Sequence, residues 1–147
     1  MAKLDLNKAL NINPKNTKNL KRLANIHIMT GNLGEAEQII QKCSNLEPKD
    51  HSHITDLHKV RTLLKEWDNL NENLKKEDNI KVEEIAAKML NDCTDYPALK
   101  LIYIKAMLDN VKLTEAISYL SSKLTNDEKS EDEFKYLTAL ALYYDGQ

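Results

Sequence analysis

The feature that most constrains the fold is a gapless internal match between two stretches of the chain. The stretch "AKLDLNKALNINPKN" (residues 2–16) can be laid over "AEQIIQKCSNLEPKD" (residues 36–50). The aligned pairs keep their chemical character: Ala2 with Ala36, Leu6 with Ile40, Ala9 with Cys43, Ile12 with Leu46 and Pro14 with Pro48. Because the two prolines lie 34 residues apart, the chain is expected to be built from repeated units of that length.

A period of 34 residues with helical patterning is that of the tetratricopeptide repeat (TPR), in which each unit is two antiparallel helices, A and B. Composition agrees with helix, because the 147 residues include only three Gly and three Pro. We therefore expect an all-α fold, a TPR helical solenoid of antiparallel helix pairs. A chain of this length has room for one domain with a sizeable core.

The apolar periodicity predicts where each repeat begins and ends. A predicted helix B from residue 33 begins with a capping box formed by Asn32 and Glu35, and Thr114 is predicted to cap a later helix B. Incomplete repeats at both ends indicate a piece of a longer repeat protein. The predicted segments are residues 1–16 as helix B of a truncated repeat, 17–50 as a full repeat, 51–94 as a repeat with a lengthened helix A, 95–126 as a further repeat, and 127–147 as helix A of a truncated repeat.

The lengthened helix is predicted from residues 51–75, which contain no Gly or Pro. Its apolar residues recur every three or four positions, and such a helix spans roughly 37 Å. We expect Leu70 and Leu74 to pack on the following helix. That helix is expected to carry an apolar face running from Val82 to Cys93.

Charge and composition exclude several classes of function. Charged residues make up 30% of the chain but give a net charge of −2, so nucleic acid and anionic membrane surfaces are not expected partners. The sequence has no signal-peptide core and no apolar run long enough to span a membrane. Cys43 and Cys93 form no disulfide framework, which indicates reduced thiols packed in the core of a cytoplasmic protein.

Two further segments resemble a known family. The segments "ALKLIYIKAMLDNVKLTEAISYL" (residues 98–120) and "EFKYLTALALYYDG" (residues 133–146) look like the middle TPR repeats of co-chaperones that carry a C-terminal J domain. The resemblance implies a protein–protein interaction scaffold that cooperates with the 70-kDa and 90-kDa heat-shock chaperones. The His-Pro-Asp trigger of a J domain is absent from these 147 residues. A TPR scaffold subunit of an unrelated multiprotein complex is the alternative.

The resemblance also suggests a peptide-binding site. Some TPR domains of this kind hold a partner's C-terminal carboxylate between Lys, Asn and Arg side chains of successive A helices. Lys21 and Asn25 have the spacing of the first such helix, but Asp56 occupies the matching place in the second helix, and Ala98 and Ile102 lie near the places in the third. The alternative is that Lys21 and Asn25 belong to a solvated polar face.

No constellation of residues predicts catalysis, a cofactor or a metal. His51, His53 and His58 with Cys43 have spacings that put them on different helix faces, and we expect these histidines to be exposed or to lie at a helix start. Nothing resembles a converging acid, base and nucleophile, so an enzyme is not expected. The last predicted helix carries Tyr143 and Tyr144 and is expected to leave an uncovered apolar stripe. Residues 131–146 are therefore expected to be either frayed or buried against another copy of the chain, which would self-associate.

Overall fold

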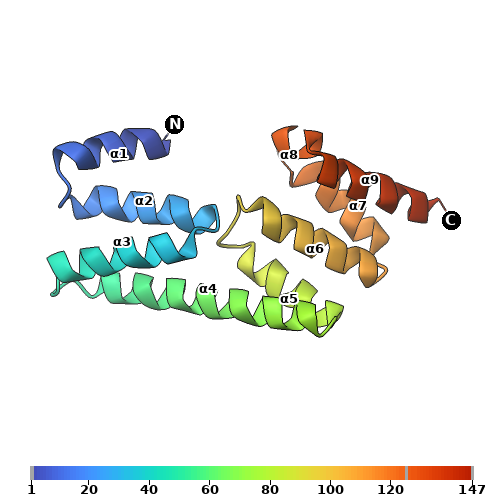
Figure 1. Ribbon diagram of the computed structural model, residues 1–147, viewed down its shortest axis with the longest axis horizontal. Coiled ribbons are helices and arrows are strands. Elements are labelled where there is room, and N and C mark those ends of the chain that lie inside the picture. Colours follow the sequence, from blue (N-terminus) through green and yellow to red (C-terminus); the bar gives the residue numbers. More distant parts are fainter. Residues whose placement is uncertain (1, 125, 147) are drawn as a thin grey trace. The chain divides into compact units, whose positions relative to one another are not determined.

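The computed structural model describes residues 2–124 and 126–146, and within these ranges it contains helices and no strand (Figure 1). This confirms the expected all-α class. The helices are α1 (Ala2–Ile12), α2 (Thr17–Met29), α3 (Leu33–Leu46), α4 (Ser52–Lys75), α5 (Asn79–Met89), α6 (Pro97–Asp109), α7 (Leu113–Ser122), α8 (Asn126–Ser130) and α9 (Asp132–Asp145).

The helices belong to two compact units. The first unit holds Met1–Asp68 with Asp92–Asp95, and the second holds Asn69–Asn91 with Tyr96–Gln147. The division falls inside α4, so this 24-residue helix contributes to both cores. Its continuity follows from a sequence without Gly or Pro, because nothing in residues 52–75 interrupts the hydrogen-bond ladder.

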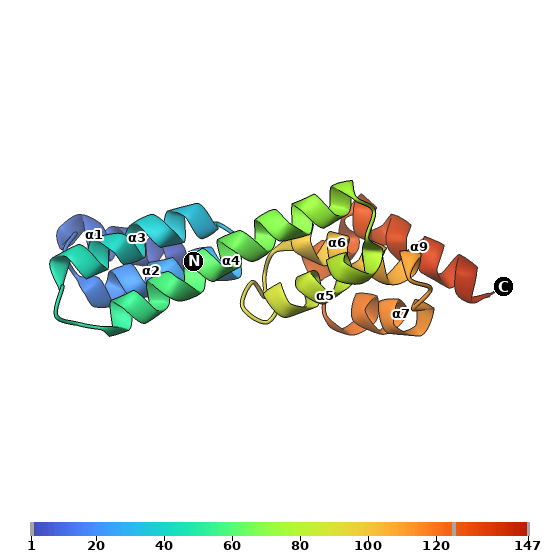
Figure 2. The same ribbon diagram turned by 90° about the horizontal axis from the view of Figure 1, so that it is seen from below.

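The first unit is built on the antiparallel pair α2 and α3, with α1 packed on the other side of α2 (Figures 1 and 2). The expected apolar face of α2 is buried, including Leu20, Leu23 and Ala24. Small side chains, Ala24 on α2 and Ala36 and Cys43 on α3, are fully buried here, which is what close helix packing requires.

One type of turn joins helix A to helix B three times along the chain. After α2, Gly31 adopts a φ of 86°, Gly31 N–H donates to the Ile28 carbonyl, and Asn32 N–H donates to the His27 carbonyl at 2.7 Å. These bonds define a Schellman motif, which needs a left-handed residue just past the helix. Glu77 after α4 and Val111 after α6 take the same place with φ values of 58° and 61°.

The second unit has its core between α6, α7 and α9. Its buried residues include Ile104 and Met107 of α6, Leu120 of α7 and Phe134 of α9. Tyr103 and Tyr119 meet edge to face with ring centroids 5.2 Å apart. Pro97 at the first turn of α6 suits its fixed backbone angle, because a helix needs no amide hydrogen there.

A buried ion pair crosses this second core. Lys100 Nζ of α6 lies 2.7 Å from Glu128 Oε1 of α8, with both side chains at most 6% exposed. The helix α8 is a short helix between α7 and α9 that carries Asp127 and Glu128 in its first turn. Glu128 therefore stabilises the fold, because it neutralises a lysine that the packing of α6 has buried.

Three local expectations are wrong. Asn32 is the N-cap of α3, but its side chain makes no capping bond among the described residues, and its amide nitrogen lies 3.4 Å from His27 Nδ1 instead. Lys112, not Thr114, is the N-cap of α7. The helix α5 ends at Met89, so Cys93 is buried from a loop rather than from a helix face.

The two leucines near the end of α4 differ in burial. Leu70 is fully buried, as is Val82 of α5 in the same unit, whereas Leu74 remains 37% exposed. The helix ends at Lys75. Leu74 therefore contributes less to the core than its place in the apolar periodicity predicts.

Candidate protein-binding surfaces

Lys21 and Asn25 lie one turn apart on α2, and the structure surrounds Lys21 with groups from the start of α4. Lys21 Nζ donates to Ser52 Oγ at 2.7 Å and lies 3.5 Å from Asp56 Oδ2. Both members of the ion pair are partly exposed, and Asn25 is exposed. The ammonium group is thus already engaged with an anion of its own chain.

This arrangement has a clear electrostatic consequence for a ligand. A carboxylate approaching Lys21 would meet the negative charge of Asp56 at the same place, and like charges disfavour each other. Asn25 keeps its amide free to face solvent. The surface can therefore offer polar contacts, but it does not concentrate positive charge.

The two thiols lie inside the first unit and away from solvent, which confirms that both pack in the core. Cys43 Sγ contacts the Thr17 carbonyl at 3.9 Å. Burial raises the pKa of the Cys43 thiol, and burial, helped by Asp92 and Glu66, raises the pKa of Cys93 to about 11. Because the thiolate is the reactive form, neither cysteine is set up as a nucleophile.

The histidines are separated by the fold. His51 and His58 are exposed, as expected, whereas Cys43 is buried. His53 lies in the first turn of α4, as expected for a histidine at a helix start, but its side chain is only 1% exposed.

An apolar groove of the second unit lies between α6 and α9, and we call it the α6–α9 groove. Its volume is about 560 Å³. It includes Ala98 and Ile102, the two residues near the clamp positions of the third predicted helix A. The lining residues are Ala98, Leu101, Ile102, Lys105, Asp132, Glu133, Tyr136 and Leu137.

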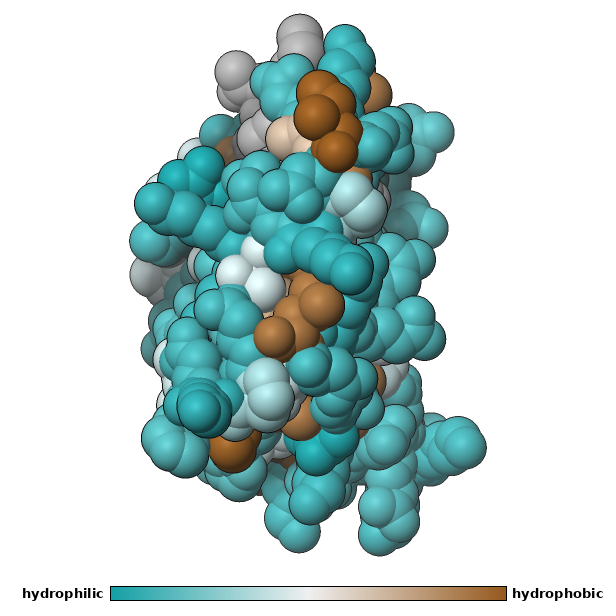
Figure 3. Space-filling model, turned by 90° about the vertical axis from the view of Figure 1, so that its left-hand side faces the viewer, coloured by the Kyte–Doolittle hydropathy of each residue, from teal (hydrophilic) through white to brown (hydrophobic). Residues whose placement is uncertain are grey.

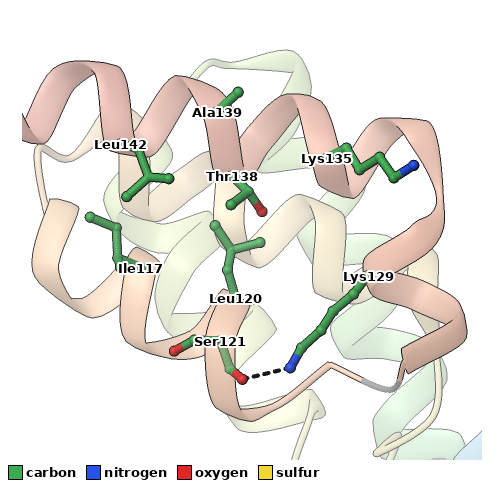
Figure 4. A pocket seen from close by; sticks show the side chains of 8 residues that line it. All are labelled: Ile117, Leu120, Ser121, Lys129, Lys135, Thr138, Ala139 and Leu142. Atoms are coloured by element: carbon green, nitrogen blue, oxygen red, sulfur yellow. Dashed lines mark hydrogen bonds between the residues drawn. The ribbon is translucent and has the colours of Figure 1, made fainter.

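A second hollow of about 530 Å³ lies between α7 and α9 (Figure 4). Ile117 and Leu120 of α7 point toward Thr138 and Leu142 of α9 across it. At one end Lys129 Nζ donates to the Ser121 carbonyl at 2.7 Å, which narrows the hollow with a charged side chain. This second hollow is called the α7–α9 hollow.

The helix α9 exposes large apolar side chains beside both depressions. Tyr136, Leu142, Tyr143 and Tyr144 are all exposed, which confirms the uncovered stripe expected near the end of this helix. The rings of Tyr143 and Tyr144 meet edge to face at 5.7 Å. The surface seen from the α1–α2 and α3–α4 turns is, by contrast, mostly hydrophilic with small scattered apolar spots (Figure 3).

The α6–α9 groove was not recognised from the sequence, although a signal for it exists. The residues of α6, "PALKLIYIKAMLD", are apolar around most of the helix rather than along one stripe. A helix of that kind must cover apolar surface on more than one side. Ile104 and Met107 of α6 are buried in the core, and Ile102 lines the groove. Leu101 lines the groove and also packs against the core.

Comparison with known proteins supports this architecture. A family model described as "Tetratricopeptide repeat" matches residues 2–59. No curated protein sequence matches the chain. Among the described residues, no helix combines the length and the apolar character needed to cross a bilayer.

A solved structure extends the likeness over nearly the whole chain. The crystal structure of the P58(IPK) TPR domain superimposes with a TM-score of 0.83 and 19% sequence identity. The match covers 97% of this chain and 40% of that chain, so this chain spans less than half the length of that protein domain. Together with the helices, the match shows that the chain has the fold of an all-α TPR solenoid, an architecture that supports protein–protein interaction scaffolds.

Proposed function

We propose that the chain is a protein–protein interaction scaffold that binds an apolar segment of a partner protein in the α6–α9 groove. The observation that carries this proposal is the groove itself, because monomeric proteins rarely leave such concave apolar surface without a use. Leu101 and Ile102 form one wall, and Tyr136 and Leu137 form the other. A tyrosine at the rim is the type of residue that most often anchors a protein interface.

The chemistry of the groove favours an apolar anchor over a chain terminus. Its charged residues are Lys105 on one side and Asp132 with Glu133 on the other. A single lysine facing two carboxylates cannot form a clamp for a terminal carboxylate, which needs several convergent donors. A partner segment with apolar side chains flanked by a basic residue fits this lining better.

We further propose that the scaffold belongs to a co-chaperone with a J domain elsewhere in the full-length chain. The support is the resemblance of residues 98–120 and 133–146 to the middle repeats of that family, together with the shared TPR fold. The proposed partners are heat-shock chaperones of the 70-kDa and 90-kDa classes, in the cytoplasm, where free thiols such as Cys43 and Cys93 persist. The alternative is a TPR scaffold subunit of an unrelated multiprotein complex.

The groove is tested by a pull-down with matched tyrosine variants of the chain. Tyr136→Ala removes an exposed tyrosine that lines the groove, whereas Tyr143→Ala removes an exposed tyrosine of the same helix that does not. We expect the first variant to lose at least about tenfold in partner recovery, as for a hot-spot residue, and the second to retain the partner. Equal partner recovery by both variants would refute the proposal that the partner binds in the α6–α9 groove.

The co-chaperone assignment has its own discriminating experiment. The full-length chain and the 147-residue chain are each used as bait, and the recovered 70-kDa and 90-kDa chaperones are compared. A His-Pro-Asp tripeptide in the full-length reading frame, with chaperones among the recovered proteins, supports the co-chaperone. Recovery of a defined complex without chaperones supports the alternative scaffold.

We propose that Lys21 and Asn25 contribute at most weak contacts to a partner's carboxylate. The reason is the ion pair between Lys21 and Asp56, which a ligand would have to disrupt. Titration calorimetry with acidic C-terminal peptides should detect no micromolar binding. Micromolar affinity that disappears in Lys21→Ala would contradict this proposal and restore a carboxylate clamp.

We also propose that the chain self-associates through α9. Leu142, Tyr143 and Tyr144 are exposed together, and Leu142 borders the α7–α9 hollow. Sedimentation velocity over a hundredfold concentration range should show dimers that Leu142→Lys abolishes. A strict monomer at every concentration would exclude this second binding mode.

A further inference from the structure

Three potential metal ligands converge at the turn between α3 and α4. They are Glu47, the C-cap of α3, Asp50 in the turn, and His53 in the first turn of α4. His53 Nε2 lies 3.5 Å from Glu47 Oε1 and 3.6 Å from Asp50 Oδ2. One ligand atom from each residue lies within 4.8 Å of the others.

The buried histidine has no hydrogen-bond partner that explains its place. His53 is 1% exposed, and in residues 2–124 and 126–146 neither ring nitrogen has a hydrogen-bond partner. Leaving a buried polar group unsatisfied costs about 1–3 kcal/mol. Because Nε2 faces two carboxylate oxygens, the three groups would together be satisfied by a cation placed between them.

The turn orients the Asp50 carboxylate before any ion arrives. Asp50 N–H donates to the Glu47 carbonyl at 3.1 Å, which closes a four-residue turn with Pro48 at its second position. Asp50 Oδ1 accepts from Ser52 N–H at 3.0 Å, so the other oxygen, Oδ2, is left to face His53. A ligand oriented by a second hydrogen bond is typical of metal sites.

We propose that Glu47, Asp50 and His53 form a binding site for a divalent transition-metal ion of the Zn²⁺ type. Ligands bonded at about 2.0–2.2 Å around a tetrahedral Zn²⁺ lie about 3.3–3.6 Å from one another, which matches both separations from His53 Nε2. A nitrogen ligand disfavours Ca²⁺ and Mg²⁺, which take oxygen. Both carboxylates are 45% exposed, so solvent can reach a fourth coordination position.

The internal repeat provides a natural comparison for this site. At the 34-residue offset, Glu47, Asp50 and His53 align with Asn13, Asn16 and Asn19, three neutral amides. The turn before α2 nevertheless closes with the same backbone bond, from Asn16 N–H to the Asn13 carbonyl at 3.3 Å. The turn itself therefore does not require the two acids and the histidine, and their presence before α4 calls for another explanation.

An ion at this site would join the end of α3 to the beginning of α4. Lys21 Nζ reaches Ser52 Oγ, next to the site, and its positive charge would lower the affinity for a cation. The bound ion is therefore expected to stabilise the α3–α4 turn. Lys21→Met should increase the affinity of the site for the ion. This role is separate from the proposed α6–α9 groove and does not depend on it.

The experiment measures Zn²⁺ binding to the purified 147-residue chain by titration calorimetry, with Co²⁺ absorption as the spectroscopic probe. We expect one ion per chain and a tetrahedral Co²⁺ spectrum without a sulfur charge-transfer band, since both cysteines are buried in the core. The triple variant Glu47→Asn, Asp50→Asn, His53→Asn copies the turn before α2. It should fold, as judged by circular dichroism, and should lose saturable binding.

Single variants separate the site from adventitious binding. His53→Asn should weaken Zn²⁺ binding at least about tenfold, whereas His58→Asn, which removes an exposed histidine of the same helix, should not change it. Addition of Zn²⁺ should shift the imidazole NMR resonances of His53. Equal binding by the wild type and the folded triple variant, or unchanged His53 resonances in the presence of Zn²⁺, would overturn the proposal.

Discussion

Val111 allows a direct test of whether the left-handed backbone in the helix A to helix B turns is strained. It occupies the left-handed position of the α6–α7 turn with a φ of 61°, a conformation that β-branched residues rarely adopt. In the α2–α3 turn the same position is held by Gly31 with a φ of 86°. We therefore predict that Val111→Gly stabilises the protein.

The magnitude follows from two opposing effects. Relief of the left-handed strain contributes roughly 1–2 kcal/mol to the free energy of unfolding. The greater freedom of glycine in the unfolded chain removes about 0.5–1 kcal/mol of that. Val111 is 78% exposed, so little apolar burial is lost. The net gain should be about 0.5–1 kcal/mol, equivalent to a rise in melting temperature of about 1–4 °C.

Urea denaturation, monitored by the helical circular dichroism signal, measures this gain in the free energy of unfolding. Val111→Ala is the matched control, because it shortens the side chain but keeps the Cβ that causes the strain, and it should gain less than Val111→Gly. The reverse change, Gly31→Ala, should lower the free energy of unfolding by about 1 kcal/mol. A lower midpoint for Val111→Gly, or an equal gain for Val111→Ala, would show that the left-handed backbone is not strained.

Three further predictions concern buried polar groups. Lys100→Met should cost about 3–5 kcal/mol of stability in urea denaturation, because it leaves Glu128 charged and buried; the double variant Lys100→Met, Glu128→Leu should recover most of the loss. Burial raises the pKa of Tyr119 to about 12, above its ordinary value of about 10. The stability that the neutral Tyr119 contributes is therefore complete below about pH 10 and is lost as the pH rises toward 12. Unfolding midpoints measured across this pH range should show this loss for the wild type and not for Tyr119→Phe. With its pKa at about 11 and no exposed surface, Cys93 should react with a thiol reagent at pH 8 far more slowly in native protein than in urea, and comparable rates would contradict its burial.

The sequence by itself determined the elements of this protein and their repetition. The 34-residue match and its apolar spacing predicted a helix from residue 33, where α3 begins. The uninterrupted residues 51–75 predicted α4 to within one residue at each end. These features are local, because a helix depends on propensity and on which face must be buried. The exposure of Leu142, Tyr143 and Tyr144 could also be predicted, since the periodicity of α9 continues beyond the core residues.

Only the tertiary structure decided how side chains distant in sequence meet. The α6–α9 groove depends on the distance between two helices separated by α7 and α8, and Asp56 neutralises Lys21 because α4 begins beside α2. His53 is buried against Glu47 and Asp50 through the path of the turn between two helices. Periodicity records which face of a helix is apolar, but burial, ion pairing and ligand geometry depend on what another part of the chain places against that face.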